Sequence, residues 1–155
     1  MDTGAFRGLR LFGHPAHAFL VHAPLGLLML PLPLDGAGWM LGDPFWHRAA
    51  FWALAGGLVA MVPAALAGFL DFVAIARDHP AEATAMRHLV VMSTAVTLFA
   101  TGLVARGGIG WPNSDGRAWA YAGCIAIGML LLMIGGWLGG ELVFRHGLGR
   151  REGTG

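Results

Sequence analysis

The sequence has little charge and no lysine. Only 12% of its 155 residues are Asp, Glu, Lys or Arg, and all ten cationic residues are arginines. A soluble domain carries roughly 25% charged residues, so this composition argues against a soluble protein. The sequence contains neither a basic run nor a stripe of interleaved basic and aromatic residues to hold a phosphate backbone. We therefore expect no nucleic-acid partner.

Cysteine is almost absent. The single Cys124 sits inside an apolar run, which excludes a disulfide framework and a cysteine-based metal site. No CxxCH motif is present, so covalently attached haem is excluded as well. The N-terminal stretch lacks the charged, apolar and small-residue order of a cleavable signal peptide, and we expect no processing there.

What the sequence does contain is four long apolar runs free of Asp, Glu, Lys and Arg, at residues 16–34, 49–70, 88–105 and 118–140. A helix needs about 20 apolar residues to cross the hydrocarbon core of a bilayer. The sequence therefore predicts an all-α polytopic membrane protein, a four-transmembrane-helix up-and-down bundle. We expect a single transmembrane domain over 1–155, with spans at about 16–38, 47–74, 86–106 and 117–143.

Four spans place both termini on one side of the membrane. That side carries seven arginines, at positions 7, 10, 77, 87, 145, 150 and 151, and the opposite side carries Arg48, Arg106 and Arg117. Cytoplasmic loops are enriched in positive charge. The asymmetry predicts that both termini are cytoplasmic.

Proline and glycine modify the predicted helices. Three prolines (Pro24, Pro31 and Pro33) fall within the first span and Pro63 within the second, where each removes a backbone donor and favours a kink. In the fourth span, Gly135 and Gly139 lie four residues apart, as do Gly136 and Gly140. Such faces allow close helix approach in lipid, either within the bundle, around a flat ligand or in a homo-oligomer. We find no convincing internal repeat in the sequence.

The ionisable residues of the spans gather at one height. His17 and His22 open the first helix, and His88 opens the third. Asp71 ends the second helix, and Glu141 and His146 end the fourth. Because successive helices alternate in direction, all six lie near the Arg-rich face. The opposite face carries residues that we interpret as belonging to the connectors: Asp35, Asp43, His47 and Asp115. Ionisable residues within spans are costly and suggest a functional site.

A b-type haem is the first ligand that this layer suggests. Bis-histidine ligation needs two imidazoles on facing helices, and His22 and His88 lie on diagonal helices of an up-and-down bundle. His17 and His146 are the alternative ligands, and Asp71 could orient a ligand. The room for the macrocycle would come from Gly68, Gly135 and Gly139.

Other functions remain open. A non-haem transition metal could use His22 and His88 with other members of the layer, and a proton relay could use the same groups. Alternatively, the protein is a cofactor-free accessory subunit of a membrane complex, with histidines that pack or reach the headgroups. No Ser–His–acid pattern emerges, so the sequence favours an electron carrier or an accessory subunit over a hydrolase or transferase.

Three motifs carry a family resemblance: GHPAHAFLVHAPLGLLMLPLPLD at residues 13–35, which ends in Asp35, GFLD at 68–71 followed by His88, and GGWLGGELVFRHGLG at 135–149. With these, the sequence resembles the bacterial membrane family known as domain of unknown function 2231. Two positions depart from the family pattern, Ala18 where proline is frequent and Ala23 where an aromatic residue is frequent. The resemblance implies a bacterial inner-membrane protein. It also implies electron transfer, with a redox protein or quinone as partner, because relatives are joined to cytochrome c or Rieske-type domains.

Overall fold

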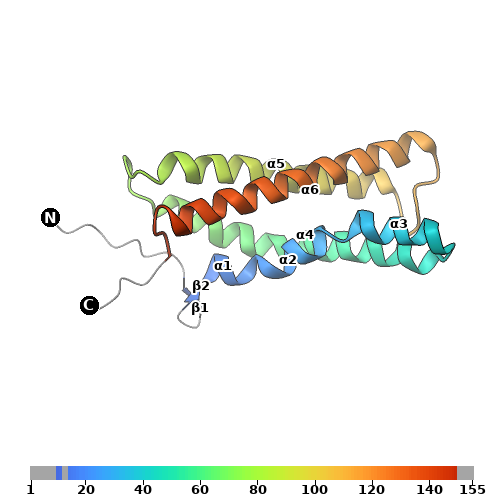
Figure 1. The fold of residues 1–155 in the computed structure, drawn as a ribbon, viewed down its shortest axis with the longest axis horizontal. Helices are drawn as coiled ribbons and strands as arrows, with labels where there is room; N and C mark the ends of the chain where they lie inside the picture. Colours follow the sequence, from blue (N-terminus) through green and yellow to red (C-terminus); the bar gives the residue numbers. More distant parts are fainter. Residues whose placement is uncertain (1–9, 12–13, 150–155) are drawn as a thin grey trace.

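The computed structural model describes residues 10–11 and 14–149. Six helical segments follow a short antiparallel pairing of β1 (Arg10–Leu11) with β2 (His14–Pro15). The helices are α1 (Ala16–Leu20), α2 (His22–Leu28), α3 (Pro31–Leu41), α4 (Pro44–Val73), α5 (Glu82–Arg106) and α6 (Asp115–Phe144). Figure 1 shows them as one elongated bundle.

The segments α1, α2 and α3 together form one span, so the described residues contain four helices long and apolar enough to cross a membrane: Ala16–Leu41, Pro44–Val73, Glu82–Arg106 and Asp115–Phe144. The prediction of an all-α membrane protein with four transmembrane helices is confirmed. A lipid bilayer is therefore the environment of this chain.

The interruptions of the first span follow its prolines. Pro24 lies in the first turn of α2, and Pro31 and Pro33 lie in the first turn of α3. The backbone N–H groups of a first turn have no partner within the helix, so proline costs little there. By contrast, α4 continues through Pro63 without a break. The predicted kinks in the first span are thus present as two breaks, at Val21 and at residues 29–30.

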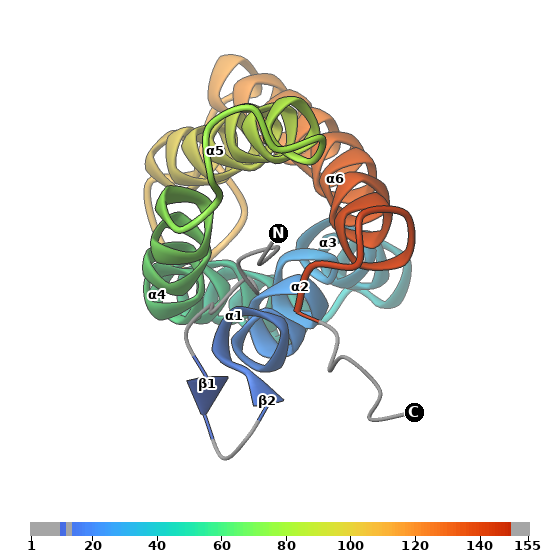
Figure 2. The ribbon, with the colours of Figure 1, turned by 90° about the vertical axis from the view of Figure 1, so that its left-hand side faces the viewer.

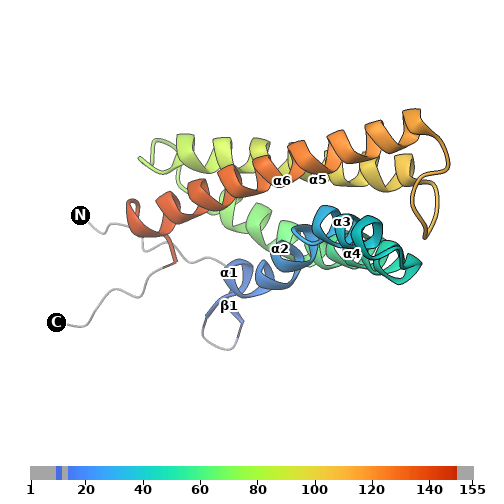
Figure 3. The ribbon, with the colours of Figure 1, turned by 45° about the vertical axis from the view of Figure 1, so that its right-hand side comes forward.

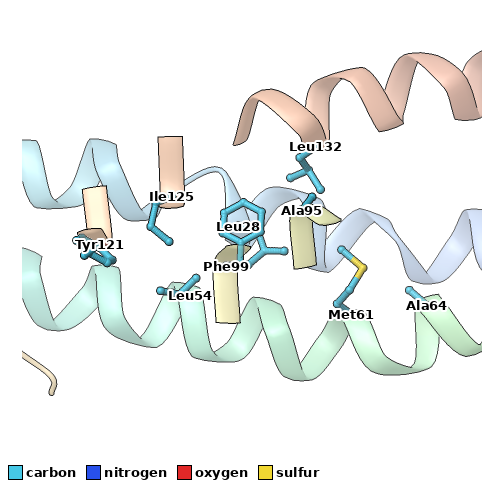
Figure 4. Packing of buried hydrophobic residues seen from close by; sticks show 9 residues of the cluster. All are labelled: Leu28, Leu54, Met61, Ala64, Ala95, Phe99, Tyr121, Ile125 and Leu132. Carbon is cyan, nitrogen blue, oxygen red and sulfur yellow. The ribbon is translucent and has the colours of Figure 1, made fainter. Parts of the chain in front are cut away.

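The four spans form two hairpins. The first hairpin consists of α1–α4 and the second of α5 and α6, and Figure 3 shows them one above the other. Seen along the bundle in Figure 2, α1 lies across from α5, with α4 and α6 on either side. The buried core between the hairpins, shown in Figure 4, draws on all four spans through Leu28, Leu54, Met61, Ala64, Ala95, Phe99, Tyr121, Ile125 and Leu132.

The bundle has two distinct ends. We call the end at which α1 and α5 begin and α4 and α6 terminate the cavity end. The other, where α3 and α5 end and α4 and α6 begin, is the far end (Figure 1). Histidines were predicted for the cavity end and only connector residues for the far end. Both ends prove to hold polar side chains inside the bundle.

Candidate functional site

A cavity of about 700 Å³ opens between the hairpins at the cavity end. Its walls come from α1, α2, α4, α5 and α6 and are mostly apolar, with Val21, Leu25 and Met92 among the lining side chains. The volume lies within the range of roughly 300–1,000 Å³ that is usual for cofactor and small-molecule sites. The predicted residues His17, His22, Gly68, Asp71, His88 and Gly139 all line this cavity.

Two imidazoles meet across the cavity. The ring centroids of His17 on α1 and His88 on α5 are 6.2 Å apart, and the ring planes are nearly perpendicular at 88°. The two residues belong to diagonal helices, as predicted for a ligand pair, but the partner of His88 is His17 rather than His22. The first turn of the first span, not the following one, therefore faces His88.

Each of these imidazoles forms a hydrogen bond with a backbone carbonyl. The carbonyl belongs to the second long helix of the same hairpin, α4 for His17 and α6 for His88. His17 Nδ1 lies 2.8 Å from the carbonyl oxygen of Ala64, and His88 Nδ1 lies 2.9 Å from that of Gly135. A carbonyl can only accept, so in both rings Nδ1 must donate its proton. In the neutral imidazole this leaves the Nε2 atom with its lone pair. Metal-bound histidines are oriented in this same way, by a hydrogen bond from the second ring nitrogen.

Glycines let the imidazoles approach these carbonyls. A Cβ atom at Gly68 would lie 2.7 Å from His17 Nδ1, a contact that real structures avoid. At Gly139 a Cβ would lie 3.4 Å from His88 Cε1, in van der Waals contact. Gly68 therefore provides space that His17 requires, and Gly139 provides a close but less restrictive wall for His88. Both glycines follow the accepting carbonyl by one helical turn.

The remaining predicted site residues take different places. His22 lines the cavity but is exposed, and its Nδ1 lies 3.2 Å from the carbonyl oxygen of Phe19. Asp71 lines the cavity near the end of α4. His146 lies beyond the end of α6, where its Nε2 is 3.3 Å from the Thr84 hydroxyl, and it does not line the cavity. Gly135 packs against Met92 and supplies a carbonyl rather than cavity space.

At the far end, two of the residues interpreted as connector residues are instead part of a buried cluster, and that interpretation is wrong for them. Asp35 lies in α3 with 1% of its surface exposed, and His47 lies in the first turns of α4. Arg106, at the last position of α5, is 2% exposed and completes an ion pair with Asp35. Asp43 and Asp115 are exposed at the starts of α4 and α6, as a connector position implies.

The far-end cluster is closely hydrogen-bonded. Arg106 donates to both carboxylate oxygens of Asp35, at 2.7 and 2.9 Å, and to the His47 carbonyl at 2.7 Å. The Tyr121 hydroxyl donates to Asp35 Oδ2 at 2.6 Å, and His47 Nδ1 lies 2.8 Å from Asp35 Oδ1. The cluster joins α3, α4, α5 and α6. A buried carboxylate in such surroundings is stable because every partner is a donor.

Aromatic rings surround this cluster. The Arg106 guanidinium lies 4.8 Å from the centroid of the Tyr121 ring. The ring of Trp111 packs against those of Trp39, His47 and Tyr121. Sequence reasoning missed the cluster because Asp35 and Arg106 each directly follow an apolar run, where a charge is usually solvated. The available signal was that the two opposite charges stand at the same place in their spans, directly after the apolar run.

Comparison with known proteins agrees with the resemblance found in the sequence. The family model described as a predicted membrane protein, DUF2231, matches residues 13–152. The chain belongs to the DUF2231 family. No curated protein and no solved structure matches it.

The DUF2231 match spans both polar clusters, from the first cavity histidine to the end of α6. Across the described part of this DUF2231 chain, no three or more His, Cys, Asp and Glu side chains gather into a group that could hold a metal ion. The cavity end thus offers a pair of imidazoles in apolar surroundings. That arrangement suits a ligand that needs two axial nitrogens and an apolar wall.

Proposed function

We propose that this membrane protein binds a b-type haem in the cavity, with His17 and His88 as the axial ligands. The observation that supports the proposal is the pair of imidazoles at 6.2 Å, each with Nδ1 donated to a carbonyl. This revises the ligand pair expected from the sequence, because the ring beside that of His88 is His17 and His22 is exposed.

The spacing of the two rings suits one metal ion between them. Two metal–nitrogen bonds of about 2 Å, with about 1 Å from each nitrogen to its ring centre, add up to roughly 6 Å. The centroid distance of 6.2 Å agrees with this sum.

The number of protein ligands favours haem over a non-haem ion. Structural zinc is held by four protein ligands and catalytic zinc by three. Haem iron takes four nitrogens from the macrocycle and needs only two more. Two imidazoles and an apolar cavity lined by Val21, Leu25 and Met92 meet that need.

The role that follows is electron transfer. Bound haem supplies one-electron chemistry, and the protein fixes the orientation of both imidazoles and excludes water with apolar walls. We propose a bacterial inner-membrane protein with cytoplasmic termini, which places the cavity near the cytoplasmic surface. A redox protein or a quinone is the partner that fits an electron carrier at that depth.

An absorption spectrum tests the proposal. The full chain is expressed with a haem precursor in the medium, purified in detergent, and recorded oxidised and after reduction with dithionite, together with its iron, zinc and copper content. We expect a Soret band that shifts and sharpens on reduction, and about one iron per chain.

Two results would overturn the proposal. Stoichiometric zinc or copper without a Soret band would make the cavity a non-haem site. A colourless, metal-free protein that remains folded in detergent would instead support the cofactor-free accessory subunit.

A further inference from the structure

The two hairpins correspond residue by residue at a constant spacing. Asp35 and Arg106, which form the buried ion pair, are 71 positions apart. The same spacing separates His17 from His88, and Gly68 from Gly139. Both cavity histidines also reach a carbonyl 47 residues further along the chain, Ala64 for one and Gly135 for the other. Ala64 and Gly135 are themselves 71 positions apart.

Burial follows the same spacing. In the core cluster, Leu28 corresponds to Phe99, Leu54 to Ile125 and Met61 to Leu132, and all six are buried. The correspondence is one of position and burial rather than of residue type. This explains why no repeat is visible in the sequence, since apolar residues replace one another freely where only burial is required.

The cavity has the same symmetry. Ten pairs of lining residues are related by the 71-residue spacing, among them His17 with His88, Gly68 with Gly139 and Leu25 with Val96. Two corresponding helices, α1 and α5, run in the same direction and lie across from each other, as do α4 and α6 (Figure 2). A half-turn about an axis along the bundle therefore exchanges the two hairpins. Parallel repeats about such an axis are a known architecture of membrane proteins.

We infer that the chain consists of two copies of one helical hairpin, α1–α4 and α5–α6, and that the cavity is the interface between the copies on their twofold axis. The inference about the ligand rests on the proposed function. The ligand takes one equivalent imidazole from each copy, as a planar metal tetrapyrrole does on its two faces.

The far-end cluster requires the two copies to carry different residues at equivalent positions, which is possible because the copies are fused in one chain. Two identical hairpins would bring two Asp or two Arg side chains together at this position, and like charges in a buried site repel. In the fused chain, Asp35 of one copy meets Arg106 of the other. The equivalent of Tyr121 is Ala50, which is buried at the corresponding place in α4. The cluster is therefore a departure from symmetry, as are the breaks of the first span, which α5 lacks.

Exchange of the cluster across the axis tests the inference in the full chain. The variant D35R/R106D/A50Y/Y121A moves the carboxylate, the guanidinium and the phenol each to its counterpart position. Its matched control, D35R/R106D/A53Y/Y121A, places the tyrosine at Ala53, which is buried on α4 but has no equivalent role. The melting temperature is measured in detergent, with R106D as the reference for a broken pair.

R106D lowers the melting temperature, and we expect the exchanged variant to recover more than half of that loss. The control should recover less than half as much as the exchanged variant. An exchanged variant that is no more stable than its control, or that fails to accumulate in the membrane, would overturn the inference. This measurement needs no haem, so it stands or falls separately from the proposed function.

A second measurement addresses the shared ligand. With haem bound, H17A and H88A should each show the same spectrum of a single-imidazole haem, and free imidazole should restore the original spectrum in both. Loss of the spectrum in one variant and an unchanged spectrum in the other would contradict equivalent ligation, while the stability test of the two copies would be unaffected.

Discussion

The two ends of the bundle use ionisable side chains in opposite ways. At the far end, Asp35 accepts hydrogen bonds from side chains of three other helices. Among the buried side-chain nitrogen and oxygen atoms of the described residues, only Arg106 Nε has no hydrogen-bond partner. At the cavity end, His17 and His88 each bind a carbonyl through Nδ1 and line a cavity. The partners of Asp35 all lie within the far-end cluster, whereas His17 and His88 lie beside a cavity.

This difference distinguishes ionisable side chains that join helices from ionisable side chains that line a cavity. Both clusters carry ionisable groups that are costly in lipid. His17 and Asp35 are 18 residues apart, which is roughly 27 Å along a helix, close to the ~30 Å thickness of the hydrocarbon core. The clusters therefore lie near opposite membrane surfaces.

Removal of the far-end guanidinium should have the largest effect on stability. Arg106→Ala leaves the Asp35 carboxylate buried without its main partner, which costs about 3–5 kcal/mol. Thermal unfolding in detergent measures the loss, and Arg48→Ala, an exposed position, is the control. If both variants unfold at the same temperature, the far-end cluster is not the structural element described above.

A paired replacement sharpens the same point. Asp35→Leu combined with Arg106→Met removes both charges and keeps apolar volume, so the double variant should lose less stability than Arg106→Ala alone. A double variant that is less stable than the single one would mean that the ion pair stabilises the bundle beyond what apolar side chains of similar volume provide.

Loss of the tyrosine hydroxyl should cost less. Tyr121→Phe removes one donor to Asp35 and keeps the ring, and a hydrogen bond to a charged group is worth about 1.5–3 kcal/mol. Thermal unfolding again provides the measurement. The haem spectrum should not change, because Tyr121 lies far from the cavity. A spectral change would link the two ends and contradict their separation.

A methyl group at Gly68 should disturb the cavity end. In Gly68→Ala the new Cβ would collide with the His17 ring, at a cost of roughly 1–3 kcal/mol for overpacking and with loss of the bond to Ala64. Titration of the purified protein with haem measures affinity, which should fall. Gly123→Ala is the matched control, since a Cβ atom at that exposed position on α6 would meet no other atom within 4 Å and Gly123 does not line the cavity. Equal affinity in both variants would remove Gly68 from the site.

The smallest effect is expected for the exposed pair at the end of α6. Arg145 and Glu141 are 3.4 Å apart, with the arginine 74% exposed. Such i, i+4 pairs contribute about 0.3–0.5 kcal/mol, so Arg145→Ala should leave both the unfolding temperature and the haem spectrum within error. A clear loss of stability would show that this ion pair stabilises the protein more than its exposure implies.

Much of the fold could be predicted from the sequence because lipid imposes simple rules. Four apolar runs predicted four spans, and prolines predicted the breaks of the first span. The height of the polar layer also followed from helix direction, and His17, His88 and Asp71 do lie around one cavity. These features depend on position along single helices, which the sequence displays directly.

Features that depend on rotation and on pairing between helices could not be predicted. His17 and His22 are five residues apart, which corresponds to about 7.5 Å along a helix and about 140° of rotation, so only one of them faces His88 on α5. The Asp35–Arg106 pair joins residues 71 positions apart, and each looked like the solvated end of a span. The repeat was hidden because the two hairpins share burial and position but few identical residues.

The central claim is that His17, not His22, is the partner of His88 at the metal. The most direct measurement is the reduced absorption spectrum of haem-loaded H17A beside that of H22A, at equal protein concentration and with iron content determined for both. We predict that H17A loses the bis-imidazole spectrum and that H22A keeps it. A spectrum that survives in H17A and disappears in H22A would contradict the account.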